Sequence, residues 1–243
     1  MTKPVTKILF IGHSLVGDVV LSSPVLQTLL EKFPQADIDV VADRRSSSLY
    51  EHVPRINRIF FKDKNKWFRG VPALLCQLWQ QRYDIVVDIR SDGLAYLLRA
   101  GKRYTKLNQG DYGPHAVEKA MGVIHSLNQN EKIKDTKVWL GEQEQQYAEE
   151  TLAGFSDKGR LLSLSVGDVV NRKPLKSWTV DHIIELIHRH KGDFTGLLFH
   201  GNEHEQQRSR EVADKIDLQY KILAGNTLLE AAALLEKSCL YIG

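Results

Sequence analysis

Short apolar runs alternate with longer amphipathic stretches along most of the 243-residue chain. Runs such as KILFIG (7–12) and YDIVVDIR (83–90) are short and apolar at nearly every position. Strands of a parallel sheet have this composition, because helices cover both faces of the sheet. The alternation therefore predicts an α/β protein built on parallel sheets.

The alternation runs through two blocks, with a more polar middle between them. In the first block we expect strands at 7–12, 37–43, 56–62, 83–90 and 103–109, and helices at 18–33, 44–53, 67–82 and 92–101. The middle predicts helices at 115–127 and 142–155. In the second block we expect strands at 160–167, 194–201, 220–225 and 239–243, and helices at 179–191, 204–216 and 227–238.

This organisation predicts two Rossmann-like doubly wound lobes. We expect an N-terminal Rossmann-like lobe at 1–141, a bridging helix or linker at 142–159, and a partial C-terminal lobe at 160–243. A complete second lobe would need about two further βα units of roughly 30 residues each. The sequence therefore predicts a second lobe that is incomplete.

Composition narrows the classes of function. The net charge of +3 gives no argument for nucleic acid as a partner. The two cysteines, Cys76 and Cys239, have neither disulfide nor zinc spacing, which suits a reducing compartment. No segment approaches the ~18 consecutive apolar residues of a membrane span. We therefore expect a cytoplasmic protein.

The loop after the first expected strand reads HSLVGDVV, with Asp18 at the start of the next helix. An aspartate at this point can cap the helix by accepting its free N–H groups. It can also take a proton from a substrate hydroxyl. The two roles compete, because a tightly capping carboxylate has a lowered pKa and is a weaker base. Gly17 allows a substrate to approach the backbone, and Ser14 either bonds an acceptor or closes the turn.

The stretch ILFIGHSLVGDVVLSSPVLQTL resembles the opening of the lipopolysaccharide heptosyltransferase family, glycosyltransferase family 9. The resemblance continues at YDIVVDIRSDG, HAVEK, KSWTVDHIIELI, GNEHEQQR and NTLLEAAALLEKSCLYIG. No single motif is decisive, and their order and spacing carry the match. The resemblance implies a GT-B-like fold, in which 1–141 is the acceptor-side lobe and 160–243 is a partial donor lobe for the nucleotide sugar. It also implies an inverting glycosyltransferase.

The resemblance implies a reaction in which heptose passes from ADP-heptose to the lipopolysaccharide inner core, a lipid-linked saccharide acceptor. Asp18 matches the Gly-Asp position of the family and is implied to be the catalytic base. Lys176, in the family's Lys-x-Trp pattern with Trp178, is implied to contact the donor's diphosphate. Asn171 and Arg172 stand where the family has small hydroxyl or glycine residues, and would have to bind the donor in their place.

Glu203 matches a family carboxylate that contacts the ribose or sugar of the donor. His200 and His204 have a spacing that can chelate a metal, but a third ligand is not evident. The resemblance implies neither a metal nor another cofactor. Family members also continue beyond the strand that matches CLYIG into an Asp-Ser/Thr-Gly loop, so we expect part of the donor site to be missing and activity to be weak or absent.

Aromatic residues and cations are interleaved at 60–82, FFKDKNKWFRGVPALLCQLWQQR. Such a segment suits contact with an anionic bilayer, here the inner face of the cytoplasmic membrane. It equally suits a basic loop beside a helix with buried aromatics.

Two other functions also remain open: transfer of a different nucleotide sugar by the same fold, and a non-catalytic binding module that keeps only the acceptor lobe.

Overall fold

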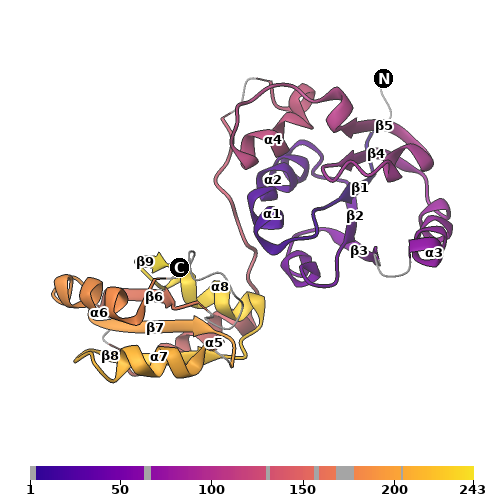
Figure 1. The fold of residues 1–243 in the computed structure, drawn as a ribbon. Coiled ribbons are helices and arrows are strands. Elements are labelled where there is room, and N and C mark those ends of the chain that lie inside the picture. Colours follow the sequence, from indigo (N-terminus) through magenta and orange to yellow (C-terminus); the bar gives the residue numbers. More distant parts are fainter. Residues whose placement is uncertain (1–3, 63–66, 130–131, 156–158, 168–177, 204) are drawn as a thin grey trace. The chain divides into compact units, whose positions relative to one another are not determined.

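The computed structural model describes residues 4–62, 67–129, 132–155, 159–167, 178–203 and 205–243. The chain divides into two compact units, unit 1 at Met1–Trp139 and unit 2 at Leu140–Gly243 (Figure 1). Each unit contains one sheet, and every strand pairing within these sheets is parallel. The prediction of two α/β lobes with parallel sheets is confirmed.

The sheet of unit 1 has five strands in the order β3-β2-β1-β4-β5. They are β1 (Lys7–Ile11), β2 (Asp37–Ala42), β3 (Ile56–Phe61), β4 (Tyr83–Asp88) and β5 (Ala100–Thr105). The strand order reverses between β1 and β4. In doubly wound sheets, ligands bind outside the carboxyl ends of the strands at this point of reversal.

Helices and hydrophobic side chains cover this sheet. The helices are α1 (Val16–Leu21), α2 (Ser23–Lys32), α3 (Trp67–Trp79) and α4 (Ala116–Gly122). Leu74 and Leu78 of α3 pack in one core cluster with Leu9 and Ile11 of β1. Helices α1, α2 and α4 contact one another, and lie together in Figure 1. β1 therefore lies at the centre of the sheet, and the loop that follows it lies at the carboxyl edge of the sheet.

The single helix expected at 18–33 is wrong: two helices, α1 and α2, meet at Ser22. The hydroxyl of Ser22 donates a hydrogen bond to the Val19 carbonyl, 3.0 Å away. Pro24 lies in the first turn of α2. A proline is accepted there because first-turn N–H groups have no partner within the helix. The proline therefore marks the start of a new helix.

The helix expected at 92–101 is also wrong. Only a 3₁₀ helix forms, at Leu94–Leu97, and Gly101 lies inside β5 rather than ending a helix. A Cβ on Gly101 would lie 2.8 Å from the backbone oxygen of Asp84. Gly101 is therefore needed where β5 approaches β4. The helix expected at 44–53 is likewise reduced to a 3₁₀ turn, Ser47–Tyr50.

The sheet of unit 2 has four strands in the order β8-β7-β6-β9. They are β6 (Leu161–Ser165), β7 (Gly196–Gly201), β8 (Gln219–Ala224) and β9 (Leu240–Ile242). Its helices are α5 (Glu142–Leu152), α6 (Val180–Arg189), α7 (Gln206–Ala213) and α8 (Leu228–Glu236). In unit 2, β6 lies between β7 and β9, just as β1 lies between β2 and β4 in unit 1.

Separate clusters of apolar side chains cover the two faces of this sheet. On one face, Ile183 and Ile187 of α6 pack with Leu162 and Phe199. On the other, Ala148 of α5 packs with residues of α8 and the strands. Helix α5, which we expected to bridge the lobes, thus contributes to the core of unit 2.

Candidate functional site

A pocket of about 180 Å³ lies at the carboxyl edge of the unit 1 sheet. Its lining consists of His13, Asp18, Leu21, Ser22, Ile89, Lys106, Ala116, Lys119 and Ala120. His13 follows β1, Ile89 follows β4 and Lys106 follows β5. The pocket therefore occupies the place where strand order reverses, which is the usual ligand position in a doubly wound sheet.

Asp18 is an exposed residue in the first turn of α1 and lies at this pocket. The N-cap of α1 is Leu15, and the helix has no side-chain cap hydrogen bond among the described residues. The capping interpretation of Asp18 is therefore wrong. The Asp18 carboxylate is left available to a ligand.

Ser14 lies in this loop, but the loop position expected for Gly17 is wrong, because Gly17 lies within α1; neither residue lines the pocket. The Ser14 carbonyl accepts a hydrogen bond from the Ser46 hydroxyl at 3.4 Å. A Cβ placed on Gly17 would meet no described atom within 4 Å. The packing of the described residues therefore does not require glycine there.

His13 is half-buried and carries an altered pKa. Burial lowers the pKa of its imidazole, and the charges of Lys106 and Arg90 lower it further, while Asp18 opposes them. The imidazole is thus held neutral near pH 7. A neutral imidazole can accept a proton or a hydrogen bond.

The sequence reasoning overlooked Lys106 and Lys119. Lys106 follows β5, whose end we expected four residues later, and Lys119 lies within the HAVEK motif on α4. The signal that could have found Lys106 is the rule that residues just after parallel strands share one edge. The sequence pattern contains no comparable rule that brings α4 to that edge.

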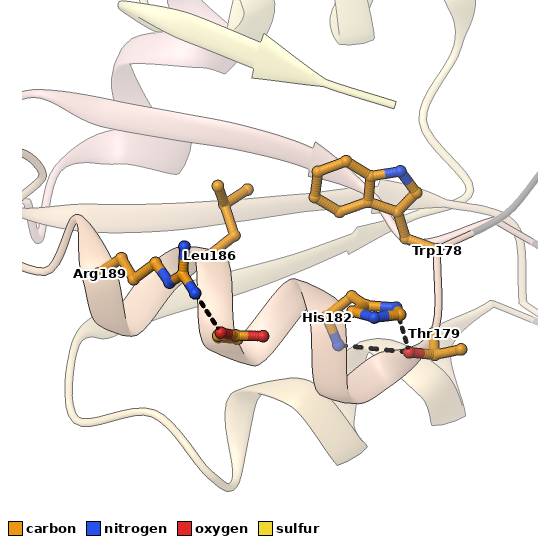
Figure 2. Close-up of a pocket in the computed structure, with 6 residues that line it drawn as sticks. Trp178, Thr179, His182, Leu186 and Arg189 are labelled. Carbon is orange, nitrogen blue, oxygen red and sulfur yellow. Dashed lines mark hydrogen bonds and ion pairs between the residues drawn. The ribbon is translucent and has the colours of Figure 1, made fainter.

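Unit 2 has a corresponding pocket of about 220 Å³ at the carboxyl ends of β6 and β9. Leu164, Ser165, Val166, Gly167, Trp178, Ile183, Leu186, Ile242 and Gly243 line it. A second hollow of about 530 Å³ shares Trp178 and Leu186. In Figure 2 the indole of Trp178 stands beside Leu186, with His182 and Arg189 projecting from α6.

Polar contacts fix the start of α6 beside this hollow. Thr179 is the N-cap, and its hydroxyl accepts a hydrogen bond from the His182 N–H at 3.3 Å (Figure 2). The same hydroxyl lies 2.9 Å from Nδ1 of His182. Arg189 pairs with Glu185 one turn earlier. Trp178 is 55% exposed, so its ring is open to a ligand.

The three expected donor residues Asn171, Arg172 and Lys176 lie outside the described residues. Arg208, which sequence reasoning overlooked, forms hydrogen bonds with the residues on either side of 168–177. Its guanidinium donates to the Gly167 carbonyl at 3.2 Å and also to the Trp178 carbonyl.

Glu203 is exposed, two residues after β7. The neighbouring Glu205 carboxylate instead accepts a hydrogen bond from the Asn202 N–H at 2.9 Å. Of the two acids, Glu205 therefore shapes the loop. His200, half of the expected chelating pair, lies 2.9 Å from the Ser163 hydroxyl through Nε2. Among the described residues, no group of three or more His, Cys, Asp or Glu side chains is placed to hold a metal ion.

No helix in the described part of the chain combines the length and the apolar character needed to cross a membrane.

Comparison with known proteins adds sequence and structural relatives. No protein-family model matches the chain. The chain is 22% identical over 199 residues to the lipopolysaccharide core heptosyltransferase OpsX of Haemophilus influenzae, covering 73% of this chain and 55% of the relative. The chain thus spans about half the length of the curated relative that it matches.

Solved structures share the fold. The glycosyl transferase family 9 structure from Veillonella parvula superposes with a TM-score of 0.81 at 18% identity, over 99% of this chain and 76% of that one. Escherichia coli ADP-heptose lps heptosyltransferase II gives 0.71 at 19% identity, over 97% and 78%. E. coli heptosyltransferase WaaC with ADP gives 0.69 at 18% identity, over 97% and 80%. The chain therefore resembles the lipopolysaccharide heptosyltransferases of glycosyltransferase family 9, and it has their GT-B-like fold of two parallel-sheet units.

Proposed function

We propose that the chain carries the acceptor and donor units of an inverting glycosyltransferase, which moves heptose from ADP-heptose to the inner core of lipopolysaccharide. The observation that carries the proposal is the position of Asp18. Its carboxylate is exposed, is not used for capping, and lies at a pocket where the strand order of unit 1 reverses. The similarity to OpsX and the fold of the heptosyltransferases support the choice of reaction.

In this reaction Asp18 accepts the proton of an acceptor hydroxyl as its oxygen attacks the anomeric carbon of the donor. The bond from that carbon to the diphosphate oxygen breaks on the opposite face, so the configuration inverts. General-base assistance of this kind contributes about 10²–10⁴-fold to a rate. The departing diphosphate gains negative charge, which a cation stabilises. We assign this role to Lys176, with Asn171, Arg172 and Glu203 as further donor contacts.

An ADP-sugar is the proposed donor because a related structure, E. coli WaaC, is described with ADP and with ADP-2-deoxy-2-fluoro heptose. The acceptor is proposed to be a lipid-linked saccharide, and unit 1 to meet an anionic membrane peripherally. Trp79, exposed on α3, supports this contact, although its indole N–H already donates to the Leu97 carbonyl at 2.7 Å. Phe60, by contrast, is buried in the core.

The test compares Asp18→Asn with Asp37→Asn, a matched control at an exposed residue that begins β2. Calorimetry measures binding of ADP and ADP-heptose, and mass spectrometry measures transfer to an inner-core acceptor. We expect Asp18→Asn alone to lose transfer by at least 10²-fold relative to the unmutated chain, with donor binding unchanged.

Three outcomes would contradict parts of the proposal. Transfer retained by Asp18→Asn would remove the base role. Binding of a uridine sugar instead of ADP-heptose would change the donor. Donor or acceptor binding without transfer in the unmutated chain would leave a binding module rather than an enzyme.

A further inference from the structure

An extended segment leads from unit 1 towards unit 2. Residues 132–139 form neither helix nor strand, and Figure 1 shows them as one extended stretch. Side chains of α2 contact this segment. The Glu31 carboxylate pairs with the Lys134 ammonium at 2.8 Å, and the Gln27 side-chain amide donates to the Asp135 carbonyl at 2.8 Å. The segment is therefore attached to a helix of unit 1.

A third contact continues the same row. The hydroxyl oxygen of the buried Ser23 accepts the Lys137 N–H at 2.7 Å. Ser23, Gln27 and Glu31 follow one another at intervals of four residues, which places them on one face of α2. Their span along the helix is about 12 Å, close to the ~10 Å that an extended chain covers from 134 to 137. The segment therefore runs antiparallel to α2 with a matching length.

The chain enters unit 2 soon after Lys137. Leu140 packs against the apolar cluster that α5 and α8 form with the sheet of unit 2. The Gly141 N–H donates to the Glu144 carboxylate at 2.9 Å, at the start of α5. The two units divide at this point of the chain. Among the described residues, a joint of 138–139 thus separates the last hydrogen bond to α2 from the first contact with the core of unit 2.

We propose that residues 134–137 act as a strap on α2, which restricts movement between the two units to the short joint 138–139. Without the strap, the next hydrogen bond to unit 1 among the described residues is at Asn128, whose carbonyl accepts from the Tyr112 hydroxyl at 2.6 Å. The joint would then lengthen to 129–139. Because the span of a flexible chain grows with the square root of its length, this change allows roughly twice the displacement.

The strap ends beside the pocket of unit 1. Ser22, which is next to Ser23, lines the pocket that contains Asp18. This inference rests on the proposed function for its consequence, since transfer needs groups of both units at one substrate. A longer joint lowers the effective concentration of one unit at the other. The strap itself is a property of the chain without substrate.

The test compares the full chain with a triple variant, Ser23→Ala, Gln27→Ala and Glu31→Ala, which removes the three contacts and keeps residues that favour a helix. Ser23→Ala alone is also measured, so that the test stands if the triple variant does not fold. Thr28→Val is the matched control for Ser23→Ala. It removes another buried hydroxyl of α2, which donates to the Pro24 carbonyl at 2.9 Å within the helix.

Two measurements report on the strap. Hydrogen exchange gives the protection of the Lys137 amide, which donates to Ser23. Double electron–electron resonance gives the distribution of distances between nitroxide labels on the two cysteines of the chain. Cys76 lies in unit 1 and Cys239 in unit 2, and both are exposed.

We expect the Lys137 amide to be protected in the unmutated chain and in Thr28→Val, and Ser23→Ala to lower this protection about tenfold. The width of the distance distribution between Cys76 and Cys239 should grow about twofold in the triple variant and stay unchanged in Thr28→Val. An unprotected Lys137 amide in the unmutated chain would overturn the inference. Equal widths in the folded triple variant and the unmutated chain would overturn it as well.

These results separate the strap from the proposed function. Unchanged widths together with normal transfer would remove the strap and leave the glycosyltransferase. The expected exchange and widths, in a chain that binds no nucleotide sugar and transfers nothing, would leave the strap and remove the glycosyltransferase. Where both hold, the triple variant should transfer roughly tenfold more slowly than the unmutated chain, because the effective concentration falls with joint length.

Discussion

The hydroxyl of Tyr50 occupies the space that a side chain at Gly12 would need. Gly12 follows β1 and precedes His13, and a Cβ built on it would collide with the Tyr50 hydroxyl oxygen. Tyr50 is buried, and among the described residues its hydroxyl has no hydrogen-bond partner. The ring packs edge-on against Phe10, with centroids 6.3 Å apart. The start of the Asp18 loop is therefore set by a close contact between two distant parts of unit 1.

Gly12→Ala should destabilise unit 1 by about 1–3 kcal/mol, because it overpacks this contact. Tyr50→Phe should be neutral or stabilising by about 1 kcal/mol, since it removes a buried hydroxyl without a partner. In the double variant, the cost of Gly12→Ala should shrink. Urea unfolding of the four proteins measures the coupling, and strictly additive effects would contradict the close contact.

A buried carboxylate is held by three elements of unit 1. Asp39 of β2 is fully buried and accepts hydrogen bonds from the Tyr83 hydroxyl and the Asn57 side chain, both at 3.0 Å. Lys7 lies 3.8 Å away. Tyr83→Phe should cost about 1–3 kcal/mol of unfolding free energy, because the carboxylate loses a donor.

The matched control for Tyr83→Phe is Tyr96→Phe, since Tyr96 is an exposed residue whose hydroxyl also has a hydroxyl partner, Thr105, at 2.8 Å. We expect that control to stay within about 0.5 kcal/mol, as surface substitutions usually do. Equal losses of unfolding free energy in the two variants would show that the hydrogen bond from Tyr83 does not stabilise the Asp39 carboxylate.

A histidine should make unit 2 sensitive to acid. Burial lowers the pKa of His200 below its usual 6.5, and its Nε2 lies 2.9 Å from the buried Ser163 hydroxyl. The unfolded chain therefore binds a proton that the folded unit resists. The stability contributed by neutral His200 is present above pH 6.5 and is lost as the pH falls from there through the lower folded pKa.

His200→Gln cannot take up that proton and should flatten this part of the pH profile. Hydrogen exchange of the Leu162 and Phe199 amides, compared between pH 7.5 and pH 5.0, reports on the two strands concerned. His182→Gln is the control at a histidine exposed on α6. If the protection factors, which correct for the intrinsic effect of pH on exchange, fall at low pH equally in His200→Gln and the unmutated chain, His200 is not the group responsible.

Arg208 should support donor binding without touching the donor itself. It ties the carbonyls of Gly167 and Trp178, which flank residues 168–177. Arg208→Ala should weaken ADP binding several-fold, because hydrogen bonds from a charged group contribute about 1.5–3 kcal/mol. Arg210→Ala, at an exposed arginine on the same helix, should leave it unchanged. Calorimetry measures the ADP affinity of both variants. Equal affinities of Arg208→Ala and the unmutated chain would show that the hydrogen bonds of Arg208 do not contribute to donor binding.

Much of the fold could be predicted because strands buried on both faces are continuously apolar. The runs around β1, β4, β6 and β7 were located to within a few residues for this reason. Errors arose where local signals conflict with packing: Gly101 resembles a helix end, but belongs to β5 because a neighbouring backbone comes so close. Pro24 lies within the run that we expected to form one helix, but it begins a second helix.

The features of the site also divide into those that the sequence predicted and those that depend on tertiary packing. The sequence by itself determined that a strand, a loop and a helix carrying Asp18 follow one another, because apolar periodicity and loop residues are local properties. Only the tertiary structure decided that Leu15 and not Asp18 occupies the cap, and that Lys106 and Lys119 join Asp18 at one pocket. Residues about 90 and 100 positions apart meet there because parallel strands end at one edge and α4 packs against α1, a long-range arrangement that no local pattern encodes.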